Sequence, residues 1–479
     1  MMYACIILYV DATENMSPED TENPSKRTKW SASTGTTTTD PATTSELQVD
    51  SSIPFSYPTP TCLSSFSALP HIAPFTVSRC HTGTYMEPPA SDPPSTTAIS
   101  ISWSTKLLKC VDASPLLIVW PDQQENTSLP VHLVVLGSHG GDVAAVDGRS
   151  GEAVWLLQLG EHVEAAAAFD PKSSLVFVGT FQGNDVDGFR SRRAPTAGAV
   201  ATEDSSSATS TPALGCLWAL NVFTGKIHWH LTTPGEIKST PLVVDESVFI
   251  ATYDGHLYQV NCRDGTLINK YACGGSVYAS PVLSADGSTV IVVTTSGNLV
   301  QFARSSEQSS LTPISTTHLV AMFSTPFTYL PPEAQQQPVV VLAGTDGTLR
   351  QLTLSDSEEI WCETVSATSF FSSSCFLVQE NSAIIGCHDG IVRKFNVQNG
   401  TILWERRIGV AIFASPHLRK NNKECVIATV AGDVLIICVK EGTILAKQRL
   451  PAEVFSSPVC IGYLIYVGCR DNRLYCLTA

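Results

Sequence analysis

The sequence predicts an all-β fold, a single closed β-propeller over residues 99–479, and three repeated features support this prediction. The first feature is a motif of three small residues, usually ending in Pro, at the start of each repeat unit. This small-residue motif occurs eight times, at Ala113-Ser114-Pro115, Ala165-Ala166-Ala167, Ser239-Thr240-Pro241, Ala279-Ser280-Pro281, Ser324-Thr325-Pro326, Ser372-Ser373-Ser374, Ala414-Ser415-Pro416 and Ser456-Ser457-Pro458. Counted by the third residue, the last five spacings are 40, 45, 48, 42 and 42 residues, the length of a four-stranded blade. We expect eight blades, with seven as the alternative if one degenerate unit is absorbed.

The second feature is a tight turn after the second strand of a unit, and the third is a Trp four residues after a Gly. The turns contain Gly and Asp, which tolerate the left-handed conformations of hairpin turns. They are Asp254-Gly255, Asp346-Gly347, Asp389-Gly390 and Gly432-Asp433. The Trp pattern occurs at Gly151…Trp155, Gly225…Trp229 and Gly400…Trp404, with Ser357…Trp361 as a variant, while Asn269 and Ala446 replace Trp in two units. We expect the indole rings to pack between neighbouring blades.

The two ends of the repeat region complement each other. The last unit stops at Ala479 without a Gly-x-x-x-Trp strand, whereas the segment from Ala98 to Lys106 precedes the first unit and contains Trp103. We therefore expect this early segment to supply the outer strand of the last unit. Such closure of the ring removes exposed sheet edges.

Two segments contain too few apolar residues to bury the surface that would offset the entropy cost of ordering the chain. Residues 1–98 are rich in Ser, Thr and Pro, which predicts a disordered N-terminal segment. Residues 184–212 lie within the second unit and are polar and aperiodic, which predicts an inserted surface loop between blade strands.

Charge and cysteine usage limit the partners and the compartment. The net charge is −15 and no Lys/Arg cluster is interleaved with aromatic residues, so we expect no nucleic-acid partner. The apolar stretch at residues 1–10 is too short to span a bilayer and has no basic flank, so we expect no membrane partner. The 15 cysteines include no C-x-x-C pair, which predicts buried free thiols rather than zinc ligands and a reducing, cytoplasmic location.

The combined pattern of small-residue motif, Asp-Gly turn and Gly-x-x-x-Trp strand resembles the pyrroloquinoline-quinone (PQQ) type of propeller repeat, as in quinoprotein alcohol dehydrogenases. Three stretches, Lys109 to Leu116, Cys273 to Pro281 and Leu450 to Leu477, are similar to the C-terminal propeller of the β-alanine-activating enzyme family. That family is also described as aminoadipate-semialdehyde dehydrogenase-like, within the acyl-CoA synthetase family. The resemblance covers residues 103–479.

The resemblance implies that this chain corresponds to the propeller of the family and not to its catalytic domains. In that family an adenylation domain and a phosphopantetheine carrier domain precede the propeller, and the enzyme activates β-alanine with ATP and holds it as a thioester. Ser33 to Thr39 lacks the following Gly and the Pro-Lys-Gly of an adenylate-forming loop, and Gly274-Gly275-Ser276 lies inside a repeat unit rather than in a carrier-arm site. We therefore expect a non-catalytic binding or docking module, accessory to amino-acid activation and carrier thioester transfer, whose partners are adenylation and carrier domains or another protein.

A stand-alone quinone-dependent dehydrogenase is the alternative, because its repeat has the same shape. As a family, such enzymes use a vicinal Cys-Cys disulfide and acidic calcium ligands, and this chain contains no adjacent cysteine pair. His228 and His230 share one face of a strand, but two imidazoles without a third ligand predict strand positions flanking Trp229 rather than a metal site.

The remaining polar residues of the repeats are expected to serve structure. The serines of the small-residue motifs lie in no nucleophile elbow, and the acidic turn residues Asp254, Asp346, Asp389 and Asp471 are expected to form turns. The sequence thus predicts no catalytic, cofactor-binding or metal-binding residues and no cofactor.

Overall fold

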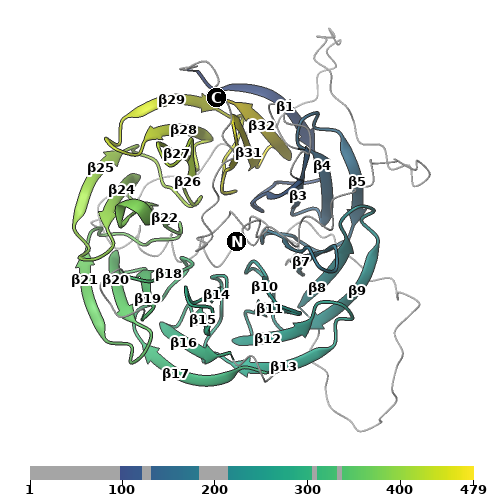
Figure 1. Ribbon diagram of the computed structural model, residues 1–479. Coiled ribbons are helices and arrows are strands. Elements are labelled where there is room, and N and C mark those ends of the chain that lie inside the picture. The colour runs from purple at the N-terminus through teal and green to yellow at the C-terminus, as the bar shows by residue number, and fades with distance from the viewer. Residues whose placement is uncertain (1–97, 121–130, 183–213, 305–309, 332–336) are drawn as a thin grey trace, which may run out of the picture. The chain divides into compact units, whose positions relative to one another are not determined.

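The computed structural model describes residues 98–120, 131–182, 214–304, 310–331 and 337–479. These residues form eight antiparallel four-stranded sheets arranged as blades around one axis (Figure 1). The eight-bladed all-β prediction is therefore confirmed. The predictions for residues 1–97 and for the 184–212 insertion fall outside the described residues. No helix in the described ranges is long and apolar enough to cross a membrane.

Blades 1 to 4 follow the order of the small-residue motifs. Blade 1 contains β2 (Leu116–Trp120), β3 (Val131–Gly137), β4 (Asp142–Asp147) and β5 (Ala153–Gln158). Blade 2 contains β6 (Ala168–Asp170), β7 (Leu175–Phe181), β8 (Gly215–Asn221) and β9 (Ile227–Thr233). Blade 3 contains β10 (Leu242–Val244), β11 (Ser247–Ala251), β12 (His256–Asn261) and β13 (Leu267–Ala272). Blade 4 contains β14 (Val282–Leu283), β15 (Thr289–Val293), β16 (Asn298–Ala303) and β17 (Thr312–His318).

Blades 5 to 8 continue around the ring, with the first strand of each blade nearest the axis (Figure 1). Blade 5 contains β18 (Phe327–Tyr329), β19 (Val339–Ala343), β20 (Thr348–Thr353) and β21 (Glu359–Thr364). Blade 6 contains β22 (Cys375–Leu377), the 3-10 turn η1 (Val378–Glu380), β23 (Ser382–Gly386), β24 (Ile391–Asn396) and β25 (Ile402–Arg407). Blade 7 contains β26 (His417–Arg419), β27 (Glu424–Ala428), β28 (Asp433–Cys438) and β29 (Ile444–Arg449). Blade 8 contains β30 (Val459–Ile461), β31 (Leu464–Cys469), β32 (Arg473–Thr478) and, as its outer strand, β1 (Ser100–Lys106).

The predicted closure of the ring by its two ends is confirmed. Strand β1 pairs antiparallel with β32 from Ser100↔Thr478 to Lys106↔Arg473. The Thr105 hydroxyl also donates a hydrogen bond of 2.7 Å to the Gly151 carbonyl oxygen in blade 1. The outer strand of blade 8 therefore comes from the other end of the repeat region.

The core lies between blades rather than within one blade. Middle strands such as β15 and β19 are buried at every position, as expected for strands covered on both faces. One representative core cluster joins Phe177 of blade 2 to Ile250 and Tyr258 of blade 3. The stability of each blade thus depends on its neighbours.

The tryptophans occupy the inter-blade position that the sequence predicts. Four indole N–H groups donate to a backbone carbonyl oxygen of the following blade: Trp155 to Val222 at 2.8 Å, Trp229 to Cys262 at 3.0 Å, Trp361 to Val397 at 2.9 Å and Trp404 to Val439 at 3.0 Å. Gly225 lies under Trp155 with a φ of 67°, and a Cβ atom there would come within 2.6 Å of the indole ring. Glycine is required because the turn is left-handed and the ring touches its backbone.

The small-residue motifs are joined by hydrogen bonds that run from blade to blade. The backbone N–H of the central residue donates to the hydroxyl of the central residue in the next motif. These bonds are Thr240 to Ser280, Ser280 to Thr325, Thr325 to Ser373, Ser373 to Ser415, Ser415 to Ser457 and Ser457 to Ser114, at 2.9 to 3.1 Å. Six of the motif hydroxyls thus accept hydrogen bonds that join neighbouring blades. The bond from Ser114 is missing because Ala166 of blade 2 has no hydroxyl, and the Thr240 hydroxyl of blade 3 also has no hydrogen-bond partner.

We predict that Ala166→Ser extends this series and stabilises the protein. The new hydroxyl can accept from the Ser114 N–H, and a net hydrogen bond contributes about 1 kcal/mol to the free energy of unfolding. Urea unfolding of the variant should show a higher midpoint with an unchanged slope. Ser457→Ala is the matched reverse variant and should lower the midpoint by a similar amount. A lower midpoint for Ala166→Ser would show that the site has no room for the hydroxyl.

Candidate functional site

The residue immediately before each small-residue motif lies at the same end of the ring axis in every blade. We call these eight residues the axial ring: Asp112, Glu164, Lys238, Tyr278, Phe323, Phe371, Phe413 and Phe455. Each follows a buried apolar residue, such as Ile412 or Val454, that anchors the segment between blades. The repeat therefore presents one variable side chain per blade around the axis.

Five consecutive members of the axial ring form an aromatic arc from blade 4 to blade 8. Ring centroids are 5.5 Å apart for Tyr278 and Phe323, 5.4 Å for Phe323 and Phe371, 5.0 Å for Phe371 and Phe413, and 5.2 Å for Phe413 and Phe455. All five side chains are only partly buried. These distances are typical of attractive ring contacts, so the arc is one continuous aromatic surface.

The other three members, Asp112, Glu164 and Lys238, form a charged arc that joins the aromatic arc at both ends. The Tyr278 hydroxyl donates to Glu164 Oε1 at 3.2 Å, which links blade 4 to blade 2. Lys238 lies 4.5 Å above the Phe181 ring and 4.9 Å above the Tyr253 ring, and its Nζ pairs with Glu236 at 3.1 Å. Burial and the nearby Glu164 and Glu236 carboxylates raise the pKa of Tyr253, so this phenol stays neutral.

Arg470 closes the axial ring between blades 8 and 1. Its guanidinium lies 3.8 Å from the centroid of the Phe455 ring. It donates from Nε to Asp112 Oδ1 at 2.9 Å and from Nη2 to Asp112 Oδ2 at 2.8 Å, and its Nη1 contacts Glu453 at 2.9 Å. This two-point contact is the geometry that guanidinium groups form best with carboxylates.

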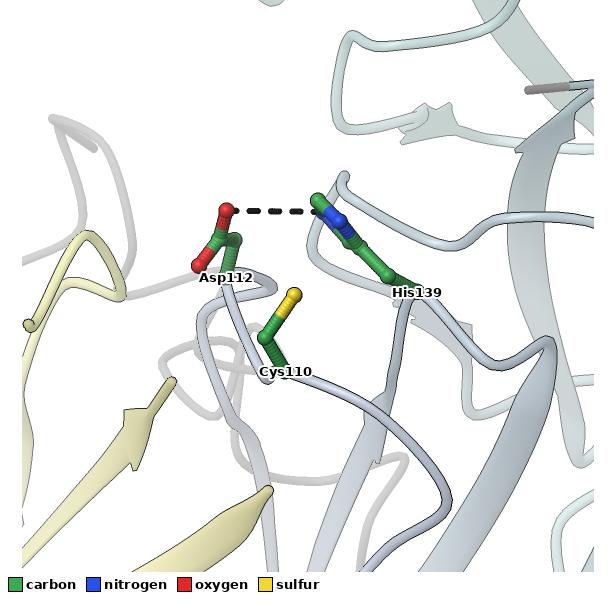
Figure 2. A group of neighbouring side chains, drawn as sticks. All are labelled: Cys110, Asp112 and His139. Atoms are coloured by element: carbon green, nitrogen blue, oxygen red, sulfur yellow. Dashed lines mark ion pairs between the residues drawn. The ribbon is translucent and has the colours of Figure 1, made fainter. Parts of the chain in front are cut away.

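Beside Arg470, the side chains of Cys110, Asp112 and His139 converge (Figure 2). Cys110 and Asp112 lie in the segment before β2, and His139 lies in the turn between β3 and β4. One potential ligand atom from each lies within 4.8 Å of the others. Burial and the Asp112 charge raise the pKa of the Cys110 thiol to about 11, against the opposing effect of Arg470.

The structure assigns ordinary roles to the residues that the sequence singled out. His230 stacks on Trp218 with ring centroids 5.0 Å apart, and His228 is exposed. Ser276 donates to the Tyr253 carbonyl oxygen at 2.7 Å, so it belongs to the turn before β14. The Ser33 to Thr39 stretch lies outside the described residues.

The turn aspartates Asp254 and Asp389 are held by several hydrogen bonds. Asp389 accepts from Arg393 Nη2 at 2.7 Å, from the Ser366 hydroxyl at 2.9 Å and from the Ile391 N–H at 2.9 Å. Burial alone would raise the pKa of Asp389, but these bonds outweigh it and lower the pKa below its ordinary value. The same balance, with bonds from Thr252 and Tyr258, lowers the pKa of Asp254.

We predict that these turns make the protein sensitive to acid. A carboxyl whose pKa is lower in the folded state stabilises the fold above the unfolded pKa, roughly 4, and the stabilisation is lost as pH falls through the lower folded pKa. Asp389→Asn should therefore lower the free energy of unfolding at pH 7. Below pH 4, the free energy of unfolding of the variant should depend less on pH than that of the wild type. Urea unfolding at a series of pH values from 7 down to below 4 measures both effects. The exposed Glu152→Gln is the control for loss of one charge, and an Asp389→Asn curve parallel to wild type would contradict the prediction.

Neither the axial ring nor the group of Cys110, Asp112 and His139 is among the sites predicted from the sequence. The ring could have been found by aligning the units on the small-residue motif and reading the preceding position. The group of Cys110, Asp112 and His139 could not have been found in this way, because its members become neighbours only when the β3–β4 turn folds beside the segment before β2.

The eight four-stranded sheets define an eight-bladed β-propeller. A europium-containing methanol dehydrogenase superposes with a TM-score of 0.61 at 10% sequence identity, over 80% of this chain and 93% of that chain. BamB from Moraxella catarrhalis superposes with a TM-score of 0.56 at 16% identity, over 80% and 98%. At these identities the similarity shows the fold alone.

The chain belongs to the family described as "Beta-alanine-activating enzyme, beta-propeller", whose sequence profile matches residues 197–479. The beta-alanine-activating enzyme of Drosophila melanogaster is 23% identical over 270 residues, which is 54% of this chain and 22% of the relative. The Homo sapiens enzyme of the same name is 32% identical over 85 residues, 18% of this chain and 7% of the relative. The aligned part of the chain thus spans less than a quarter of the length of these relatives.

Proposed function

We propose that this chain is a non-catalytic binding module, accessory to ATP-dependent amino-acid activation and carrier thioester transfer. The observation that carries the proposal is the axial ring, in which five partly exposed aromatic side chains adjoin carboxylates and two cations. Aromatic residues are enriched where proteins bind partners. We infer that an adenylation or carrier domain docks at this end of the axis.

The chemistry of the axial ring suits an amino acid held on a carrier. The relatives are named for β-alanine, whose free ammonium group would remain when its carboxyl is held as a thioester. Aromatic faces and carboxylates both attract an ammonium group, and Phe323 and Phe371 lie in the same ring as Glu164. Tyr278 lies between the phenylalanines and Glu164, and its hydroxyl donates a hydrogen bond to the Glu164 carboxylate.

We predict that weakening the aromatic arc weakens carrier binding. A Phe371→Ala/Phe413→Ala double variant should bind a separately expressed carrier domain loaded with β-alanine at least about tenfold more weakly, because large ring contacts dominate interfaces. Titration calorimetry with the full chain measures the affinity. Leu403→Ala is the control, because Leu403 is 51% exposed on the outer wall strand β25. No carrier binding by the wild type, or equal affinities for the double variant and the control, would refute the docking site.

The proposal also predicts that the chain alone forms no aminoacyl adenylate. Adenylate formation needs a loop that holds the phosphates and a Lys that offsets developing charge, and no segment of the sequence offers the two together. ATP–pyrophosphate exchange with β-alanine should remain at background, with a full-length β-alanine-activating enzyme as positive control. Exchange above background would overturn the non-catalytic role. No specific observation favours the quinone-dependent dehydrogenase.

A further inference from the structure

We propose that Cys110, Asp112 and His139 form a three-ligand binding site for Zn²⁺ at the axial end of blade 1. Their ligand atoms lie within 4.8 Å of one another and the three side chains are partly buried. The His139 backbone N–H donates to the Cys110 carbonyl oxygen at 3.0 Å. This bond fixes the β3–β4 turn against the segment that carries the other two ligands (Figure 2).

His139 supplies an independent indication of a ligand. Its side chain is 10% exposed, and its buried Nε2 atom makes no hydrogen bond. Asp112 Oδ2 lies 3.4 Å from this nitrogen, an ion pair if the imidazole is protonated (dashed line in Figure 2), but the two atoms are not in hydrogen-bonding geometry. Buried polar atoms in native proteins nearly always have a partner, and a cation between imidazole and carboxylate would provide one.

The ligand set suits Zn²⁺ by charge and by softness. Thiolate, carboxylate and imidazole are the three side-chain types that zinc binds in proteins. A thiolate and a carboxylate together carry two negative charges, which match a divalent ion, while Glu453 pairs with the positive charge of Arg470. Three protein ligands leave one tetrahedral position for water or for a group from a partner.

Arg470 positions the carboxylate ligand from outside the site. It holds both oxygens of Asp112 and is itself stacked on Phe455. Carboxylates that bind metals are commonly held by such hydrogen bonds. Arg470 donates from Nε to both oxygens, at 2.9 and 3.3 Å, and from Nη2 to Oδ2 at 2.8 Å. A carboxylate has about four acceptor positions, so the guanidinium contact and metal binding are compatible.

The repeat shows that the site is specific to blade 1. The equivalent of His139 in blade 6 is His388, but the positions equivalent to Cys110 and Asp112 are there Ser369 and Phe371. His388 contacts the rings of Phe371 and Phe413 instead. Among the described residues, only the blade 1 group brings three potential ligand atoms of His, Cys, Asp or Glu within 4.8 Å of one another.

Metal titration of the full chain, first stripped with a chelator, tests the proposal. Zn²⁺ should bind with one high-affinity site that depends on these residues, and Co²⁺ should give a thiolate-to-cobalt charge-transfer absorption band. Cys110→Ser should abolish the band, and Asp112→Asn and His139→Gln should weaken Zn²⁺ binding at least about tenfold. Zn²⁺ should also raise the melting temperature of the wild type but not of these variants.

Two controls separate this site from other thiols and imidazoles. Cys362→Ser removes an exposed thiol, and His388→Gln changes the equivalent repeat position, so both should retain the wild-type band and affinity. Far-UV circular dichroism identifies any ligand variant that fails to fold. If one fails, the metal binding of the other two ligand variants tests the proposal. The proposal is overturned if the wild type gives no charge-transfer band, or if the band and the affinity survive in the folded ligand variants.

Discussion

Deleting residues 1–106, which removes β1 with everything before it, is expected to cause global destabilisation and aggregation. The deletion breaks six paired positions between β1 and β32, together with the Thr105 contact to blade 1. At about 1 kcal/mol per net hydrogen bond, the loss is comparable to the whole stability of an ordinary domain, about 5–15 kcal/mol. It also leaves β32 as an unpaired edge, which can pair with other chains.

Deleting only residues 1–97 is the matched control, because this truncation retains β1. Thermal unfolding and size-exclusion chromatography of the two truncations isolate the effect of the strand. A separately added peptide covering residues 98–106 should raise the melting temperature of the longer deletion by completing blade 8. If the two truncations are equally stable and equally monomeric, then the closure of the ring contributes nothing to stability.

Much of the fold could be predicted because the same glycine, tryptophan and small-residue positions recur in several units. Gly225 and Gly400 mark turns that must pass beneath an indole ring, and the Trp positions mark the strands that cover them. Trp103 lies outside the order of the units, and its displacement is what predicted the closure. The structure adds the hydrogen bonds between small-residue motifs, whose direction depends on how the blades pack rather than on any local pattern.

The candidate sites could not be predicted in the same way, because they depend on the residues that depart from the repeat. Asp112 and Phe455 occupy the same repeat position in blades 1 and 8. A repeat is recognised by the positions that stay the same in each unit, so a position that varies between units does not contribute to the prediction. Arg470 and Asp112 are 358 residues apart in sequence and meet only because the ring closes. The axial end is therefore where the eight blades of this chain differ from one another, whereas their strands follow the same pattern in every blade.

Trp229→Ala is expected to lower the free energy of unfolding by about 3–5 kcal/mol, the range for removing a large aromatic side chain from a core. Trp229 is 9% exposed and lies on the outer strand of blade 2. Its indole covers Gly265 of blade 3, donates to the Cys262 carbonyl oxygen and packs against Phe177 at 5.6 Å between ring centroids. The substitution therefore opens a cavity between two blades and leaves a carbonyl oxygen without its donor.

Trp229→Phe separates the two contributions, because it retains most of the ring packing but cannot donate to Cys262. It should lower the free energy of unfolding by about 1–3 kcal/mol, the cost of an unsatisfied buried group. Ile227→Ala is the control on the same strand, since Ile227 is 44% exposed, and its effect should stay within about 0.5 kcal/mol. Urea unfolding of the three variants gives the comparison. Because blades are stabilised by their neighbours, a loss between blades 2 and 3 should lower the midpoint of one cooperative transition. An effect of Trp229→Ala no larger than that of Ile227→Ala would show that the tryptophans do not hold adjacent blades together.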